Sequence, residues 1–329
     1  MNEGHDKNGT FGRIADLPIS PREYYELVTR FNRLIQNELA EKLAQRSDEF
    51  GSAVTLVTPG SDGRLEKGSQ VSALEIIALI DEKVDIDLFE KTLTETLSKI
   101  SATRISKIIE VKDPETKLAI FKGNPRIVQP GRIADSRPVY GSRRASTNAK
   151  IQLGKEIIAS SSGEIVGRVG DLRKDARRAT REGRNRIGGK DAIHFDLETG
   201  VVYFDPTAHQ LSFKIGPLRL VQNTLLGEEI KHTRTENEPN FISTLNSNIV
   251  RRLGQLSEDK LVNLSRSSVR EIMDHYAFFL RLYHRSEHAY DQRGEVTLQL
   301  DKSEIEEVAR RLQALSALME DFKIKKHPQ

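Results

Sequence analysis

Cysteine is absent from this chain of 329 residues. The absence excludes disulfide bonds, cysteine nucleophiles and zinc sites built from thiolates. Also missing is an apolar run of about 20 residues, the length that a membrane-spanning helix needs. The first residues contain no apolar core of the kind found in signal peptides. We therefore expect a cytoplasmic protein with no membrane partner.

A strong excess of one charge is missing as well. Lysine and arginine together number 51 and aspartate and glutamate 48, which gives a net charge of +3. This balance provides no argument for a nucleic-acid partner. Charged residues make up 30% of the chain and hydrophobic residues 37%, with no low-complexity tract. We therefore expect a folded protein that is long enough for two domains.

The apolar pattern predicts an α+β protein. Ser20, Pro21 and Glu23 form a helix-start signature, and apolar residues at helical spacing continue the helix to about Gln45. Short apolar runs bounded by turn residues predict strands over residues 53–58, 71–80, 104–111, 118–121 and 201–204. Residues 122–150 contain three prolines, and we expect them to be largely irregular.

The expected domains follow one another along the chain. A flexible tail covers residues 1–18, a mixed-sheet core with its N-terminal helix covers residues 19–215, and a helical bundle covers residues 216–329. Two capping-box signatures predict the starts of the last two helices, Ser268 with Glu271 and Ser303 with Glu306. Apolar residues three and four apart in the final helix indicate that it packs in a bundle.

The segment GSDGRLEKGS, between two predicted strands, has the residues for phosphate chemistry. Gly60 lets the backbone approach a ligand closely, and the Ser61 hydroxyl lies beside backbone amides that can bind phosphate oxygens. Arg64 adds a planar cation suited to phosphate. Glu75, in the next strand, can bind a magnesium ion that bridges the phosphates. The alternative is an ordinary Gly-rich turn, in which Arg64 and Glu66 are surface charges. Glu75 can likewise face solvent from its strand.

This order of residues resembles the DNA polymerase β-type nucleotidyltransferase superfamily, most of all the branch of bacterial uridylyltransferases and glutamine-synthetase adenylyltransferases. Those proteins carry Gly-Ser after a strand, then an Arg-Glu pair, then a strand with Ser-Asp-x-Asp. The matching residues here are Gly60, Ser61, Arg64, Glu66 and the segment Ser72–Glu75. Residues 132–141 are also similar to an Asp-x-Arg-x-x-x-Gly segment of that branch, and residues 213–230 to the start of its later helices. The likeness covers about residues 20–290.

The resemblance implies a nucleotidyltransferase-like mixed sheet with flanking helices and a C-terminal helical bundle. It implies transfer of a nucleoside monophosphate from an NTP to a hydroxyl group of a protein or small molecule, with Mg²⁺ or Mn²⁺ as cofactor. The residues implied in nucleotide binding are Gly60, Ser61, Arg64 and Glu66. Glu75 would bind the metal and, together with Asp135, supply the catalytic carboxylates. NTP is the implied partner, with a protein acceptor as a second one.

Ala73 departs from that pattern. It stands where the first metal-binding aspartate is expected, and Glu75 stands where the second one is. Two-metal phosphoryl transfer needs clustered carboxylates. The other acids that can complete such a cluster are Asp62, Glu66, Asp113 and Asp135. Two interpretations stay open: an active nucleotidyltransferase, or a degenerate one that binds a nucleotide or a partner protein.

Three further motifs have ordinary interpretations. The acids of Asp85-Ile86-Asp87 fit the N-terminus of a helix. His284 and His288 form an HxxEH pattern that matches an inverted zinc-protease motif, but they also fit two polar-face histidines near a helix end. The basic stretch over residues 168–190 alternates with aspartate at helical spacing, which favours a solvated face over contact with phosphates, an acidic partner or nucleic acid.

Overall fold

The contacts of the chain divide it into two compact units. The structure is a computed structural model that describes residues 14–45, 48, 54–68, 74–80, 91, 95, 105–111, 130–159, 164–184, 193–204, 209–293 and 298–325. The sheet unit comprises residues 28–161 and 233–252, and the helical unit comprises residues 1–27, 162–232 and 253–329. This grouping interleaves along the chain, whereas the predicted domains are contiguous and meet at residue 215, so those domain boundaries stay a prediction.

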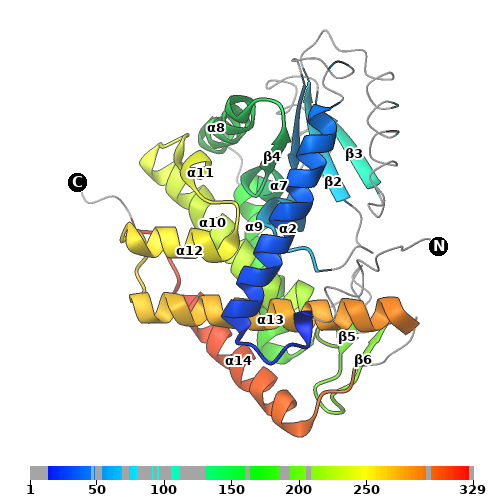
Figure 1. Ribbon diagram of the computed structural model, residues 1–329. Helices are drawn as coiled ribbons and strands as arrows, with labels where there is room; N and C mark the ends of the chain where they lie inside the picture. Colours follow the sequence, from blue (N-terminus) through cyan, green and yellow to red (C-terminus); the bar gives the residue numbers. More distant parts are fainter. Residues whose placement is uncertain are drawn as a thin grey trace, which may run out of the picture. The chain divides into compact units, whose positions relative to one another are not determined.

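A four-stranded sheet forms the centre of the sheet unit (Figure 1). Its strands are β1 Val54–Thr58, β2 Leu74–Ile80, β3 Ile105–Val111 and β4 Arg137–Tyr140. Their order is β3–β2–β1–β4, with β1 antiparallel to both neighbours and β2 parallel to β3. All residues of β1 are buried, as expected for the VTLVT run in the middle of a sheet. The predicted α+β class is confirmed, and so are four of the predicted strands in their described residues, three in this sheet and the one over residues 201–204 in the helical unit.

Several helices belong to the sheet unit together with this sheet. They are α2 Pro21–Ala44, which belongs to the sheet unit from Val28 onward, α4 Gly60–Arg64, α7 Pro130–Ala134, α8 Arg143–Ala159 and α11 Phe241–Thr244. α8 contacts β1 and β4, and α4 contacts β1 and β2. α2 begins as predicted, because the N–H of Ser20 donates to Glu23 Oε2 at 2.8 Å and the N–H of Glu23 donates to Ser20 Oγ at 3.3 Å.

Residues 130–150 are regular, and the expectation of an irregular segment there is wrong. Pro130 is the first residue of α7, a position where the N–H that proline lacks has no helical partner anyway. Pro138 lies in β4, which is an edge strand among the strands that the structure describes. The prolines therefore mark positions that tolerate them. The strand predicted over residues 118–121 lies outside the described residues.

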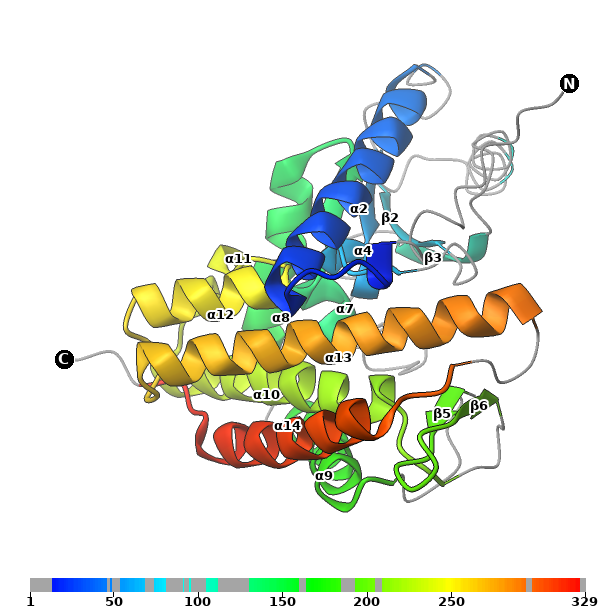
Figure 2. The same ribbon diagram turned by 60° about the horizontal axis from the view of Figure 1, so that its bottom comes forward.

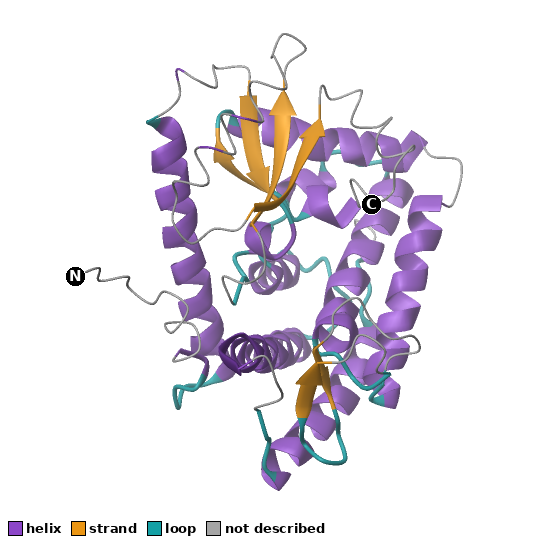
Figure 3. Cartoon of the chain, turned by 90° about the vertical axis from the view of Figure 1, so that its right-hand side faces the viewer, coloured by secondary structure: helices purple, strands orange, loops and turns teal. Residues whose placement is uncertain are grey.

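The helical unit is built from long helices and one strand pair. Its elements are α9 Glu164–Glu182, β5 Ile193–Phe195, β6 Val202–Phe204, the π-helix η1 Lys214–Leu218, α10 Arg219–Glu236, α12 Ile249–Glu258, α13 Arg266–Arg293 and α14 Lys302–Asp321, of which α10 and α12 share residues with the sheet unit. α13 and α14 lie side by side (Figure 2), and β5 and β6 form an antiparallel pair (Figure 3). No helix in the described part of the chain combines the length and apolarity needed to cross a membrane.

The last two helices begin slightly before their predicted starts. The Ser265 hydroxyl accepts from the N–H of Ser268 at 3.1 Å, so Ser265 takes the capping position predicted for Ser268. α14 has a capping box between Asp301 and Glu304, two residues before the predicted pair. Both segments are rich in serine and acidic residues, and several spacings therefore satisfy the same signature.

Candidate functional site

The loop expected to bind phosphate follows β1 and begins with the single helical turn α4. Gly60 starts this turn with a φ of 62°, in the left-handed region that favours glycine, and Leu65 ends it with a φ of 61°. The N–H of Glu66 donates to the carbonyl of Ser61 at 2.8 Å. Gly60 and Ser61 are half-buried. The backbone of this loop is therefore a defined turn whose first two residues reach the surface.

Close packing and hydrogen bonds fix the loop in the sheet unit. A Cβ atom on Gly63 would lie 2.2 Å from the carbonyl oxygen of Asp135 and 2.4 Å from that of Thr58. From α2, Gln36 Nε2 donates to the carbonyl of Asp62 at 2.5 Å and to Thr58 Oγ1 at 3.1 Å. The loop therefore has little freedom to move away from β1 or from the segment that carries Asp135.

Arg64 is buried in ion pairs with two carboxylates. Its Nε donates to Glu66 Oε2 at 2.7 Å, and its Nη1 donates to Asp135 Oδ2 at 2.7 Å. Arg64 is 9% exposed and Glu66 3%. Asn248 Nδ2 also donates to the Arg64 carbonyl at 2.8 Å. The structure thus brings together three predicted site residues, and it does so by binding them to one another; their contacts with a nucleotide stay a prediction.

Asp135 binds a second arginine through its other carboxylate oxygen. Arg252 Nη2 donates to Asp135 Oδ1 at 2.8 Å. Burial alone would raise the pKa of Asp135, but the charges of Arg252 and Arg64 outweigh it and hold the pKa below its ordinary value. We call Arg64, Glu66, Asp135 and Arg252 the closed network. Each oxygen of Asp135 is thus bonded to a guanidinium group, and its role as a catalytic carboxylate stays a prediction.

Glu75, the predicted metal ligand, lies in β2 opposite Lys107 of β3. Its side chain and the whole of Ala73 lie outside the described part of the chain, as do Asp85, Asp87 and Asp113. Within the described part, no three His, Asp or Glu side chains gather as a set of metal ligands would. The Mg²⁺ or Mn²⁺ cofactor stays a prediction.

Four arginines that the sequence analysis did not single out lie near one another in the sheet unit. We call Arg33 of α2, Arg137 of β4, Arg143 of α8 and Arg251 of α12 the arginine cluster. Burial lowers the pKa of the Arg137 guanidinium, and the charges of Arg33, Arg251 and Arg143 lower it further. The buried Nε atoms of Arg33 and Arg137 have no hydrogen-bond partner among the residues that the structure describes.

The arginine cluster lies beside the Gly60 loop. Arg137 is paired with Thr58 across the sheet, and Thr58 Oγ1 donates to the Arg137 carbonyl at 3.4 Å. Gln36, which follows Arg33 by about one turn of α2, donates to the same Thr58 Oγ1 at 3.1 Å. Thr58 is the last residue of β1, immediately before Pro59 and Gly60. Strand pairing therefore places the backbone of Arg137 beside the start of the loop, and α2, which carries Arg33, is bonded there through Gln36.

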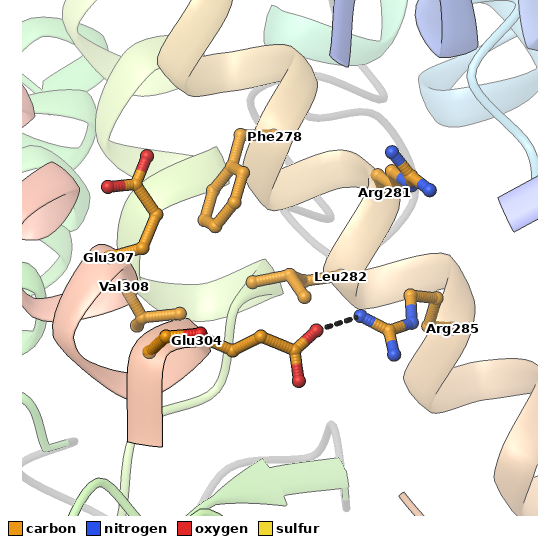
Figure 4. Close-up of a pocket in the computed structure, with 8 residues that line it drawn as sticks. Phe278, Arg281, Leu282, Arg285, Glu304, Glu307 and Val308 are labelled. Carbon is orange, nitrogen blue, oxygen red and sulfur yellow. Dashed lines mark hydrogen bonds and ion pairs between the residues drawn. The ribbon is translucent and has the colours of Figure 1, made fainter. Parts of the chain in front are cut away.

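In the helical unit, a cavity of about 300 Å³ lies between α13 and α14. In Figure 4, Phe278 and Leu282 of α13 line it together with Glu304, Glu307 and Val308 of α14. A dashed line marks the bond from Arg285 Nη1 to Glu304 Oε1, which is 2.9 Å long. Arg281, also in the lining, donates to the carbonyls of Ala15 and Ile19 at 2.6 and 2.7 Å. Both lining arginines thus tie segments of this unit together.

The HxxEH histidines of α13 do not share a polar face. His284 is buried, and its Nδ1 is joined to the hydroxyl of Tyr24 by a hydrogen bond of 2.6 Å. Burial raises the pKa of the Tyr24 hydroxyl above its ordinary value. The interpretation of His284 as a polar-face residue is wrong, because the first turn of α2 covers it.

The basic helix α9 forms ion pairs with acids on its own surface and on its neighbours. Lys174 Nζ lies 3.4 Å from Asp171 Oδ1, and Arg173 Nη1 lies 3.1 Å from Glu228 Oε1 of α10. The first of these pairs is largely exposed and the second is mostly buried. α9 therefore combines the expected solvated face with a face that packs in the helical unit.

No protein-family model matches the chain, and no curated protein sequence matches it. The likeness to nucleotidyltransferases therefore rests on the motifs around Gly60, Ala73 and Asp135 in the sequence itself.

Proposed function

We propose that this protein is a degenerate nucleotidyltransferase-like module that acts by binding a nucleotide or a partner protein and does not transfer a nucleotidyl group. The proposal starts from the resemblance carried by Gly60, Ser61, Arg64 and Glu66, and from the mixed sheet in which a glycine-containing turn joins β1 to the following strand. This turn, with its half-buried Gly60 and Ser61, is where a nucleotide would approach the sheet unit.

The state of Asp135 is the observation that carries the proposal. Both of its oxygens bind buried arginines, Arg64 at 2.7 Å and Arg252 at 2.8 Å. Two-metal transfer needs carboxylates that neutralise the ions and orient the leaving pyrophosphate. Ala73 removes one expected carboxylate from the sequence, and the closed network engages another. Loss of catalysis with retention of the fold follows from these two changes together.

Titration and turnover assays on the full chain test the proposal. ATP, GTP, CTP and UTP are titrated calorimetrically with Mg²⁺ or Mn²⁺ and again with the metal chelated, and pyrophosphate release is followed in parallel. We expect no release from any of the four nucleotides. If one nucleotide binds, it is identified as the ligand. If the folded protein binds none of them, the proposal is restricted to binding a partner protein. Metal-dependent release of pyrophosphate would overturn it in favour of an active transferase.

The variant Ala73→Asp sharpens this test. It introduces the aspartate that the family pattern has at this position and leaves Arg64 and Asp135 unchanged. The variant therefore tests whether transfer lacks only this one carboxylate. We expect the variant to stay inactive, because Asp135 remains bound to two arginines. A gain of metal-dependent turnover would contradict the role that we give to the closed network.

A further inference from the structure

We propose that the cavity between α13 and α14 is a binding site for a small zwitterion with an apolar body, namely an α-amino acid with an aliphatic or aromatic side chain. The cavity lies within the helical unit and is lined by none of the residues around the Gly60 loop. The inference therefore goes beyond the proposed function and does not depend on it. It rests on the apolar base of the cavity, on the opposite charges of its two sides, and on an arginine with N–H donors to spare.

Three apolar side chains form the base of the cavity. Leu282 of α13 and Val308 of α14 are buried, and Phe278 of α13 is half-buried beside them. In Figure 4, Phe278 and Leu282 project from α13 toward α14. Such a surface binds the apolar part of a ligand because their contact removes both from water. A volume of about 300 Å³ is at the low end for ligand sites, so it suits a molecule of the size of one amino acid.

The two helices line the cavity with opposite charges. Arg281 and Arg285 come from α13, whereas Glu304 and Glu307 come from α14 (Figure 4). A ligand with a single charge meets as many like charges as opposite ones. A zwitterion can turn its carboxylate toward α13 and its ammonium group toward α14, so that both of its charges are matched. Because Arg281 already donates to backbone carbonyls, we assign the carboxylate of the ligand to Arg285.

Arg285 has hydrogen-bond donors left for this carboxylate. Its Nη1 donates to Glu304 Oε1 at 2.9 Å, and its Nε lies 3.3 Å from Asp16 Oδ1. The Nε atom is nevertheless buried without a hydrogen bond among the residues that the structure describes, so Asp16 balances its charge without bonding to it. A guanidinium group has five N–H donors. The carboxylate of an amino acid supplies acceptors for those that remain.

Glu304 has acceptor positions left for the ammonium group. Its Oε1 accepts from Arg285, and its Oε2 accepts from the N–H of Asp301 at 3.1 Å. A carboxylate has about four acceptor positions, so each oxygen can take a further donor. The Glu304 and Arg285 side chains are 36% and 20% exposed, and a pair of this kind is weak enough to adjust around a ligand. The bound amino acid would extend the pair to a group of four alternating charges.

Calorimetric titration of L-leucine and L-phenylalanine into the full chain tests the site. We expect at least one of them to bind, and glycine, which lacks the apolar part, to bind at least about tenfold more weakly. Each amino acid that binds is compared with the same molecule lacking its amino group or its carboxylate. These analogues are isocaproate and isoamylamine for leucine, and hydrocinnamate and phenethylamine for phenylalanine. Each analogue should bind about tenfold more weakly than its amino acid, because one charge is missing.

The variants Glu304→Gln and Arg285→Gln test the two charged sides of the cavity. Each should weaken binding of the amino acid by about tenfold, and glutamine at position 304 keeps the capping box with Asp301. Glu306→Gln and Arg270→Gln are the matched controls, because they remove the same charges from the same two helices. Both control residues are exposed, and neither lines the cavity. We expect the controls to change the dissociation constant by no more than about twofold, and thermal unfolding verifies that each variant is folded.

Three results would overturn the inference. The first is that folded wild-type protein binds neither leucine nor phenylalanine. The second is that an analogue with one charge binds as tightly as its amino acid, which would make the cavity a site for apolar acids or amines. The third is equal weakening in the cavity variants and in their controls. None of these measurements involves a nucleotide or pyrophosphate, so failure of this site and failure of the proposed function are distinguishable.

Discussion

Arg64 and Arg252 lie in a network with carboxylates, whereas Arg33 and Arg137 lie in a cluster of like charges. Both groups belong to the sheet unit and lie near the end of β1. In the closed network each guanidinium bonds to Asp135 within 2.8 Å. In the arginine cluster, two buried Nε atoms have no acceptor among the described residues. The same type of side chain is therefore fully bonded in one place and has an unbonded Nε in the other.

The difference between the two groups teaches how charge balance separates a structural site from a binding site. A buried cation that is already neutralised gains little from a new anion, because its charge and its hydrogen bonds are satisfied. A buried guanidinium Nε–H without an acceptor gains a hydrogen bond from an anion that reaches it. The sequence motif predicts that Arg64 binds phosphate. Its buried ion pairs with Glu66 and Asp135 instead favour a structural role.

Of the substitutions that test this comparison, Asp135→Ala should cause the largest change in the free energy of unfolding. It leaves Arg64 and Arg252 buried without their shared counter-ion, which should lower the free energy of unfolding by about 3–5 kcal/mol. Chemical denaturation of the wild type and the variant measures the change. Asp171→Ala is the control, because Asp171 makes an exposed pair with Lys174, for which the loss should be about 0–1 kcal/mol. A loss below 1 kcal/mol at Asp135 would contradict the closed network.

Gly63→Ala tests the packing that joins the loop to the Asp135 segment. The added Cβ would meet two backbone oxygens, at 2.2 and 2.4 Å, which cannot rotate away. We expect a loss of about 1–3 kcal/mol in the free energy of unfolding, as for overpacked cores. The control is Gly170→Ala in α9, where nothing lies within 4 Å of the new Cβ. There we expect a gain of roughly 0.5–1 kcal/mol, and equal effects at both glycines would contradict the packing.

The pH dependence of stability sharpens the same comparison. The pKa of Asp135 lies below its ordinary value in the folded protein, since Arg252 and Arg64 outweigh the effect of burial. The contribution of Asp135 to the free energy of unfolding is therefore fully present above the pKa of an unfolded aspartate. It is lost as the pH falls through the pKa that Asp135 has in the folded protein. Unfolding by denaturant between neutral and acid pH should show a steeper loss for the wild type than for Asp135→Asn. Parallel curves would show that Asp135 does not provide this linkage.

Arg33→Gln should cause the smallest change in the free energy of unfolding, and this change should be a gain. Removing one of several like charges relieves repulsion, so the ligand-free protein should gain a few tenths of a kcal/mol, about 0.2–0.5, in stability. Thermal unfolding in a phosphate-free buffer measures it against Arg30→Gln, which lies outside the cluster. A clear destabilisation by Arg33→Gln would place Arg33 with the structural arginines.

Much of the fold was predictable because its signals are local. The Ser20–Glu23 capping box starts α2 as predicted, and the buried run of β1 lies where its apolar residues indicated. Residues 122–150 misled the prediction because proline was taken as a sign of irregular chain, whereas Pro130 and Pro138 occupy a first helical position and an edge strand. The N-terminal caps of α13 and α14 lie three and two residues before their predicted positions, because several serines and acids near each helix start fit the same signature.

The candidate site was predictable only in part, because its bonds join distant residues. Arg64 and Asp135 are 71 positions apart, and Asp135 and Arg252 are 117 apart. No local pattern shows that such residues meet. One signal for the arginine cluster was present: between Arg126 and Lys155 the sequence contains a single acid, Asp135. That imbalance was visible, although the sequence gives no sign that Arg33 and Arg251 join it.

The bond between Tyr24 and His284 has a consequence for how the chain is made. The two residues are 260 positions apart, and Arg281 contacts the carbonyl of Ala15 over 266 positions. Protein synthesis adds about 5–20 residues each second, so the first turn of α2 waits on the order of tens of seconds for its partners. During that interval Tyr24 and the apolar residues beside it are exposed. We therefore expect this part of the nascent chain to stay unpacked until α13 has left the ribosome.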